Sequence, residues 1–159
     1  MELENNIKAL DRIIQSIDKE IPRTVTNPDA LVDHLNQLYI KYSEDLNLAE
    51  VFEYDDVGRP SVTLTITLDV EFDIKKVMEN MKARLQIEPQ EQTDEIGKTG
   101  VVWSCGRYDF VYDDDSGNLR ISHRYSHKRR NTQSVLSITK RMIGYAGDYL
   151  EEVSKSIAG

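Results

Sequence analysis

The residues that suggest chemistry gather in the second half of the chain, beginning with an acidic run. Asp113-Asp114-Asp115-Ser116-Gly117 has the oxygen-rich composition of a calcium-binding loop. A loop of the EF-hand type needs a glycine at its sixth position and a glutamate at its twelfth. Counted from Asp113, those positions hold Asn118 and Arg124. Because an arginine stands where a carboxylate is required, we interpret the run as a hairpin turn.

Two histidines and the single cysteine are candidates for a metal site or a nucleophile. His123 and His127 are four residues apart, a spacing that aims both imidazoles at one metal only on a helix. The alternation around them indicates a strand instead, on which they lie about 13 Å apart. Cys105, between Ser104 and Gly106, lacks the glycine pattern of a nucleophile elbow. We therefore predict no metal, no cofactor and no catalytic residue, and a buried, inert Cys105.

A basic segment from Ser116 to Arg141 departs most from the rest of the chain. It contains seven lysines and arginines and no acidic residue, whereas the remaining residues include 13 basic and 28 acidic ones. Part of the segment alternates as a strand whose cations share one face and lead into a basic turn. We predict that this basic face binds a partner. Its residues are Arg120, Arg124, Lys128, Arg129 and Arg130.

Three interpretations of this basic face stay open. The cations can pair with the acidic surface of the chain itself, for example with Asp69 and Glu71 on a neighbouring strand. They can bind an acidic or phosphorylated protein, or the second subunit of a dimer. They can also bind nucleic acid, because arginine, lysine and tyrosine interleave in the strand and turn at residues 119–130.

Length and composition bound the class of protein. The chain has 159 residues, of which 39% are hydrophobic and 30% charged, and we predict a single globular domain over residues 1–159. The net charge of -8 and the isoelectric point near 4.9 disfavour non-specific binding to nucleic acid or to anionic membranes. The sequence shows no membrane span, no leader pattern and no cysteine framework. We therefore expect a cytoplasmic protein.

Two helices are predicted before the first strand. An apolar seam with alternating spacings of four and three, ended by Pro22, predicts an amphipathic helix over residues 1–22. This helix packs either on its own domain or against a second copy in a dimer. Asn27 followed by Pro28 predicts the start of the second helix. The seam consists of Leu3, Ile7, Leu10, Ile14, Ile17 and Ile21.

Two similar segments follow, each with two strands and a helix. They are either a structural repeat or two separate hairpins that share only the aspartate and glycine of their turns. In the first, Val51–Tyr54 and the alternating run Val62–Phe72 predict the strands, and Asp73 caps the helix. The stretch from Glu88 to Lys98 is polar and acidic, and we predict an exposed loop there.

The second segment repeats the pattern and ends the chain. Strands are predicted from Val101 through Tyr112 and from Leu119 to about His127, followed by a long helix over residues 132–157. Two such ββα units predict an α+β fold. Its antiparallel sheet has helices packed on one face and is preceded by two N-terminal helices.

The order of these elements resembles the type III secretion chaperone-like fold, a superfamily that includes the YbjN-type proteins. The local likeness lies in Ser116-Gly117-Asn118-Leu119-Arg120-Ile121 and in Tyr145-Ala146-Gly147-Asp148-Tyr149-Leu150. It covers residues 28–157 by element order and about 40 residues by sequence pattern. The resemblance implies a homodimer that binds an extended protein segment and has no enzymatic activity. The additional helix at residues 1–22 departs from that pattern.

The sequence as a whole therefore predicts a non-catalytic, chaperone-like module. It is expected to form a homodimer and to bind another protein, through an acidic or extended segment of that partner, and not to bind membranes. The alternative prediction is a nucleic-acid-associated protein that uses the basic strand and turn at residues 119–130.

Overall fold

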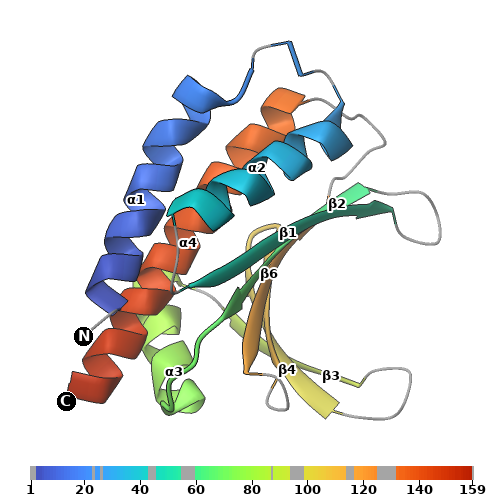
Figure 1. Cartoon of the computed structure of the whole chain (residues 1–159). Coiled ribbons are helices and arrows are strands. Elements are labelled where there is room, and N and C mark those ends of the chain that lie inside the picture. The colour runs from blue at the N-terminus through green and yellow to red at the C-terminus, as the bar shows by residue number, and fades with distance from the viewer. Residues whose placement is uncertain are drawn as a thin grey trace.

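The computed structural model describes residues 3–22, 24–25, 27–42, 46–54, 60–86, 88–93, 99–113, 117–124 and 132–158. Helices and strands alternate in blocks along the chain (Figure 1). In order, they are α1 (Leu3–Glu20), α2 (Pro28–Tyr42), β1 (Asn47–Tyr54), β2 (Pro60–Thr67), α3 (Ile74–Leu85), β3 (Glu88–Thr93), β4 (Thr99–Cys105), β5 (Tyr108–Asp113), β6 (Asn118–Arg124) and α4 (Thr132–Ala158).

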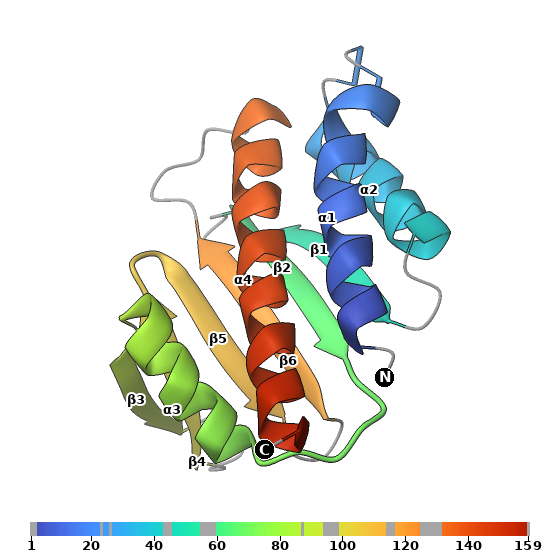
Figure 2. The same cartoon turned by 90° about the vertical axis from the view of Figure 1, so that its left-hand side faces the viewer.

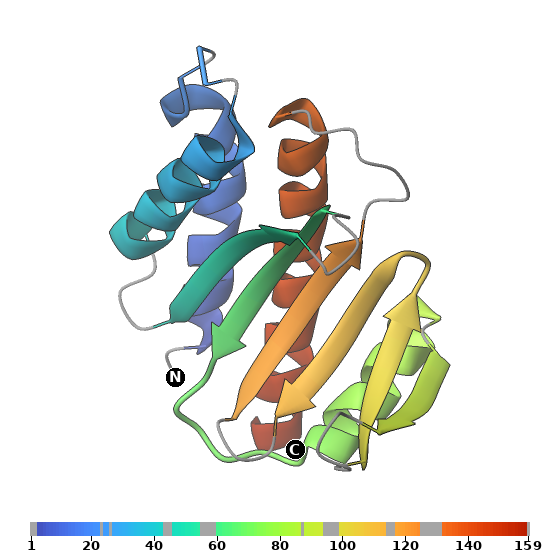
Figure 3. The same cartoon turned by 90° about the vertical axis from the view of Figure 1, so that its right-hand side faces the viewer.

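The strands form one antiparallel sheet in the order β1-β2-β6-β5-β4-β3. The helices lie together on one face of this sheet (Figure 2), and the described residues place no helix on the other face (Figure 3). α4 runs along the middle, over β2 and β6, with α1 on one side and α3 on the other, while α2 covers β1. This arrangement confirms the predicted α+β class.

Both predicted ββα units are present, and they meet in the middle of the sheet. β1 and β2 form the first hairpin, β5 and β6 form the second, and β2 pairs with β6. Cross-strand neighbours such as Leu64 and Ile121 therefore share the helix-covered face, where both are buried. The prediction missed the β3–β4 hairpin, which is inserted between the two units and extends the sheet to six strands.

The long strand predicted over Val62–Phe72 is wrong at its end, because β2 stops at Thr67. The last residues of β2 pair with Asn47 of β1 and Asn118 of β6, where both neighbouring strands begin. Alternation continues in the sequence beyond Thr67, but the described residues offer no neighbouring backbone to pair with it. Val70 is consequently exposed, although it continues the apolar side of the alternation.

The loop predicted between Glu88 and Lys98 is also wrong in part, since residues 88–93 form strand β3. β3 is an edge strand that pairs only with β4, so backbone hydrogen bonds define it without an apolar alternation that the sequence could reveal. The strand predicted from Val101 to Tyr112 is in fact two strands, β4 and β5. They are joined by a tight turn in which Gly106 adopts a positive φ of 60°.

Local capping signals predicted the helix starts correctly. The Asn27 side chain accepts a hydrogen bond from the backbone N–H of Asp29 at 2.8 Å, at the start of α2. The Asp73 carboxylate accepts hydrogen bonds from the N–H groups of Lys75 and Lys76, at 3.1 and 3.4 Å, at the start of α3. α3 ends at Gln86, whose left-handed conformation (φ 58°, ψ 39°) turns the chain away directly after Leu85.

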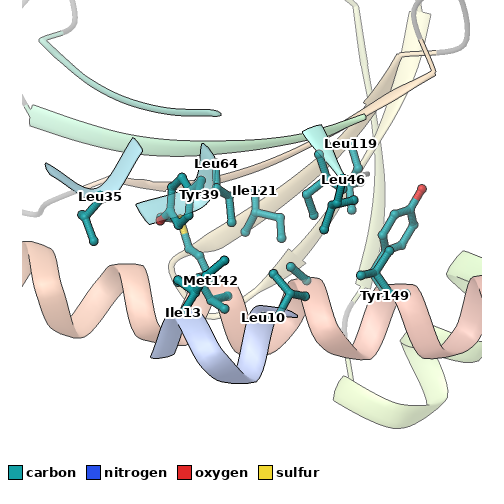
Figure 4. Packing of buried hydrophobic residues seen from close by; sticks show 14 of the residues in the cluster. Leu10, Ile13, Leu35, Tyr39, Leu46, Leu64, Leu119, Ile121, Met142 and Tyr149 are labelled. Carbon is teal, nitrogen blue, oxygen red and sulfur yellow. The ribbon is translucent and has the colours of Figure 1, made fainter. Parts of the chain in front are cut away.

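One hydrophobic core fills the layer between the helices and the sheet (Figure 4). Leu10 and Ile13 enter it from α1, Met142 from α4, and Leu64 and Ile121 from the sheet. Four residues of the predicted apolar seam are thus buried within the chain, where α1 packs against α4 and α2, and the other two, Ile7 and Ile14, are half-buried. Packing on its own domain, the first of the two interpretations of residues 1–22, accounts for this burial.

Replacement of Ile13 by alanine tests this role of α1. Ile13 is fully buried, so Ile13→Ala should lower the free energy of unfolding by about 2–4 kcal/mol. Ile7→Ala, at a half-buried position, should have a smaller effect. Denaturant titrations at several protein concentrations measure both values. A loss that grows on dilution would show instead that the seam joins two chains.

Candidate functional site

The structure places the predicted partner-binding residues on the helix-free face of the sheet, as far as it describes them. Arg120 is exposed in the middle of β6. Arg124 ends the same strand and takes a register position on the same face, because it lies four residues further along. Lys128, Arg129 and Arg130 lie outside the described residues.

Among the described residues, the direct neighbours of Arg120 on this face carry no positive charge. The register neighbours of Arg120 are Thr65 on β2 and Val111 on β5. Asp109 and Asp113, two residues on either side of Val111, point to the same face and lie diagonally opposite Arg120. Arg120 forms no ion pair with a described residue, so the nearby carboxylates balance its charge only at a distance.

The predicted pairing of this face with Asp69 and Glu71 is not formed by the described residues. Both carboxylates are exposed and lie beyond the end of β2, so they have no register position opposite β6. Neutral groups hold the strands together here instead. Thr63 and Ser122 exchange a hydrogen bond at 3.0 Å, and Thr67 donates to Asn118 at 2.6 Å.

His123 lies on the opposite, helix-covered face of β6, where it is buried. Its ring packs against that of Tyr108, with centroids 4.7 Å apart. Burial, and to a lesser extent the nearby positive charge of Arg107, lowers the pKa of His123. His127 lies outside the described residues, and within the described part of the chain no group of three or more metal-binding side chains gathers.

A buried carboxylate that the sequence prediction did not single out joins the two layers. Glu50 of β1 points to the helix side and is only 2% exposed. One carboxylate oxygen accepts a hydrogen bond from the Tyr39 hydroxyl of α2 at 2.6 Å. The other accepts a hydrogen bond from the Thr139 hydroxyl of α4 at 2.8 Å. The side chain of Glu50 therefore links β1 to two helices that lie 11 and 89 residues away in the sequence.

This link is unusual because burial favours the protonated form of the Glu50 carboxyl group. Burial raises the pKa of Glu50 from 4.5 to about 7, and the hydrogen bonds from Tyr39 and Thr139 lower it only in part. Burial and the neighbouring carboxylate also raise the pKa of Tyr39. Both donors to Glu50 are neutral hydroxyl groups, so they satisfy the carboxylate oxygens without supplying a counter-charge.

Asn36, one turn before Tyr39, fixes the backbone at the same place. Its amide accepts a hydrogen bond from the Glu50 N–H at 2.8 Å and donates one to the Glu50 carbonyl at 2.9 Å. The side chain thus pairs with the outer edge of β1 as a neighbouring strand would. This contact covers the middle of an edge strand and disfavours pairing with another chain there.

A surface groove on the helix side is the clearest candidate for a docking site. It lies between the end of α3 and the neighbouring helix α4, which run side by side in Figure 2, and its volume is about 560 Å³. Among the described residues, α3 covers only the C-terminal half of α4 on the side of the groove, and Ser137, Arg141 and Gly144 are exposed. The groove is lined by Leu85 of α3 and by Ser137, Lys140, Arg141, Gly144, Tyr145 and Asp148 of α4.

Ion pairs fix both helices that form the groove. At its lower end, Arg84 of α3 contacts Asp148 at 2.9 Å, Glu151 at 2.6 Å and Glu152 at 3.3 Å, all on α4. On the side towards α1, Lys140 contacts Asp18 at 2.8 Å.

Arg141 is the charged residue of the lining whose charge is not balanced by an ion pair with a described residue. Its side chain is exposed, and it forms no ion pair with a described residue. The charges of Lys140 and Asp148, by contrast, are both compensated by ion pairs within the chain. Arg141 therefore supplies the uncompensated positive charge of the groove.

The aromatic wall of the groove is held from behind by the sheet. The Tyr145 ring lies edge-on to Tyr108, with centroids 5.3 Å apart, and to Phe110, with centroids 5.4 Å apart. Such pairs contribute beyond the burial of area alone and restrict the rotation of each ring. Tyr145 is therefore a rigid, half-buried surface beside the open backbone of Gly144.

The sequence offered only a weak signal for these two sites. Lys140 and Arg141 lie in the basic segment, but the segment alone does not show that β6 and α4 present their cations on opposite sides of the sheet. Gly144 weakens a long helix and could have been noticed for that reason. Glu50 gave no signal, because its burial depends on distant partners.

Comparisons with known proteins do not extend these observations. No protein-family model matches the chain, and neither does a curated protein or a solved structure. The resemblance to the type III secretion chaperone-like fold therefore stays a prediction. Among the described residues, no helix combines the length and the apolarity that crossing a membrane requires.

Replacement of Glu50 by glutamine tests the buried carboxylate. Below pH 4.5 Glu50 is protonated in both the folded and the unfolded chain. As the pH rises, the unfolded chain loses this proton first, so the wild type loses stability up to about pH 7. The pKa difference between 4.5 and about 7 corresponds to about 3 kcal/mol. Glu50→Gln should remove this component of the pH dependence, measured by denaturant titration from pH 4.5 to 8.

Tyr39→Phe is the matched control for this experiment. It keeps the aromatic ring but removes one hydrogen-bond donor to the carboxylate, so the pKa of Glu50 should rise further and the loss of stability should extend to higher pH. Parallel stability curves for the wild type and Glu50→Gln would show that Glu50 does not titrate in this range.

Proposed function

We propose that this chain is a non-catalytic, chaperone-like module that binds an acidic segment of another protein. Its docking site is the groove between α3 and α4, and the bound segment lies against Tyr145 and Arg141. The observation that carries the proposal is the combination of a rigid aromatic wall with an uncompensated arginine on a protein of net charge -8. The compartment that fits this role is the cytoplasm.

The composition of the groove supports recognition of a protein segment. Leu85 and Tyr145 supply apolar surface, and Arg and Tyr are the side chains that most often dominate protein interfaces. A shallow, open groove fits a segment of a macromolecule better than an enclosed small molecule. Apolar contact then supplies affinity, while Arg141 supplies orientation.

Charge complementarity favours an acidic partner. The acidic surface of this chain repels acidic proteins in general and attracts basic ones without selectivity. Arg141 offers a local exception beside an apolar wall, which selects a segment that combines carboxylates with apolar side chains. The partner is therefore recognised at this groove and disfavoured elsewhere on the surface.

The alternative, binding of nucleic acid through residues 119–130, has less support from the described residues. Arg120 shares its face of the sheet with Asp109 and Asp113, and carboxylates beside a cation weaken its attraction for phosphate groups. The homodimer is a separate proposal. Since α1 uses its apolar seam inside the chain, a second copy would have to bind at another surface.

Charge reversals on the two faces distinguish the proposals. Arg141→Glu should abolish capture of acidic protein partners from a lysate of the source cells, because it repels their carboxylates from the groove. Arg120→Glu, an equally exposed reversal on the helix-free face, should leave capture unchanged. The measurement is quantitative mass spectrometry of the proteins retained by each immobilised variant.

The opposite pattern would contradict the groove as the docking site. If Arg120→Glu loses the partners and Arg141→Glu keeps them, the basic face predicted from the sequence is the binding surface. Titration with mixed DNA and RNA at low salt completes the comparison. Binding that falls steeply with salt and is lost in Arg120→Glu would establish the nucleic-acid alternative.

A further inference from the structure

The wall of the groove formed by α4 offers no backbone groups for a partner to pair with. Ser137 to Asp148 lie in the interior of a helix of 27 residues, where every N–H and C=O group is bonded along the helix. An extended segment in the groove would therefore leave its own N–H and C=O groups without partners along this wall. A helix satisfies its backbone internally and meets no such cost.

Gly144 gives the groove a place where another backbone can approach closely. It is exposed, and a Cβ atom built on it would meet nothing within 4 Å. Nothing inside the chain therefore requires a glycine at this position. Glycine weakens a helix interior relative to almost any other residue, and at this position it leaves the backbone of α4 open to a molecule that occupies the groove.

The residues around Gly144 define the chemistry of that molecule. Leu85 and Tyr145 provide apolar contact on the side towards α3, and Arg141 provides a positive charge one turn before Gly144. Helices that lie side by side pack with residues spaced by three and four. An amphipathic helix with apolar residues and a carboxylate at such spacings matches this lining.

We propose that the occupant of the groove is an acidic amphipathic α-helix of a partner protein, which crosses α4 at Gly144. This inference rests on the proposed function and narrows the expected partner from an acidic or extended segment to a helix. From Ser137 to Asp148 the groove follows about 16 Å of α4. The contacting part of the partner helix spans about three turns over that distance.

Peptide selection tests the inference on the full chain. A phage-displayed library of random 16-residue peptides, a length chosen for about four helical turns, is selected against the immobilised protein. The expected binders are acidic and amphipathic, and their affinity is measured by calorimetry. A proline placed in the middle of the best peptide should abolish binding, because proline breaks a helix.

Gly144→Gln is the matching variant of the protein. Glutamine is a good helix former, so the melting temperature should rise, whereas its side chain should hold the peptide helix away from α4 and weaken binding about tenfold. Gly147→Gln is the control. A Cβ atom on Gly147 also meets nothing within 4 Å, but this residue lies outside the groove. It should raise the melting temperature equally and leave the affinity unchanged.

The possible outcomes test the helical form of the partner separately from the groove as its binding site. In one outcome, the peptides lose affinity with Arg141→Glu and still bind after both the central proline and Gly144→Gln are introduced. Such peptides would show that the groove is the binding site but that its occupant is not a helix. The proposed function would be overturned if the peptides bind Arg141→Glu as tightly as the wild type. It would also be overturned if the library yields no binder. Loss of affinity with Gly144→Gln alone supports the inference.

Discussion

The apolar face of α4 has to be buried against the sheet, and α1 and α3 take their positions from that contact. Met142, Ala146 and Val153 are fully buried along this helix, which lies over the neighbouring strands β2 and β6. α1 and α3 then pack on either flank of α4 and are fixed to it through polar side chains, Lys140 with Asp18 and Arg84 with Asp148. Because α3 is only 12 residues long against 27 for α4, one flank of α4 stays partly uncovered. The groove is thus a consequence of unequal helix lengths.

Glu50 shows how a polar group can be placed in that packing without a charged partner. A leucine at this position would fill the space with less desolvation, since an ionised carboxylate loses hydration when it is buried. The two hydroxyl groups recover part of that loss, and they do so only when α2, β1 and α4 are in register with one another. Asn36 adds the same requirement for the backbone of Glu50. The contact therefore specifies how the layers fit together more than it stabilises them.

Local signals predicted the elements that depend on local physics. Asn27 and Asp73 cap their helices through bonds to residues two or three positions away, and the alternation in β2 reflects its own two faces. β3 could not be predicted in this way, because an edge strand is defined by the backbone of its neighbour β4. The end of β2 at Thr67 depends in the same way on where β1 and β6 begin. Non-local pairing therefore decided both β3 and the end of β2.

The candidate site shows that sequence-based prediction has the same limit for charged surfaces. A run of cations along the sequence predicted one basic surface, but β6 and α4 are packed on one another, so their exposed sides face opposite directions. The strand presents Arg120 among polar neighbours and carboxylates, where a charge contributes little on its own. The helix presents Arg141 in a groove that is also lined by Leu85 and Tyr145, so a partner bound there would displace water and strengthen the interaction with the same charge. The apolar surroundings of Arg141, which only the fold brings together, therefore make the helix side the better candidate for recognition.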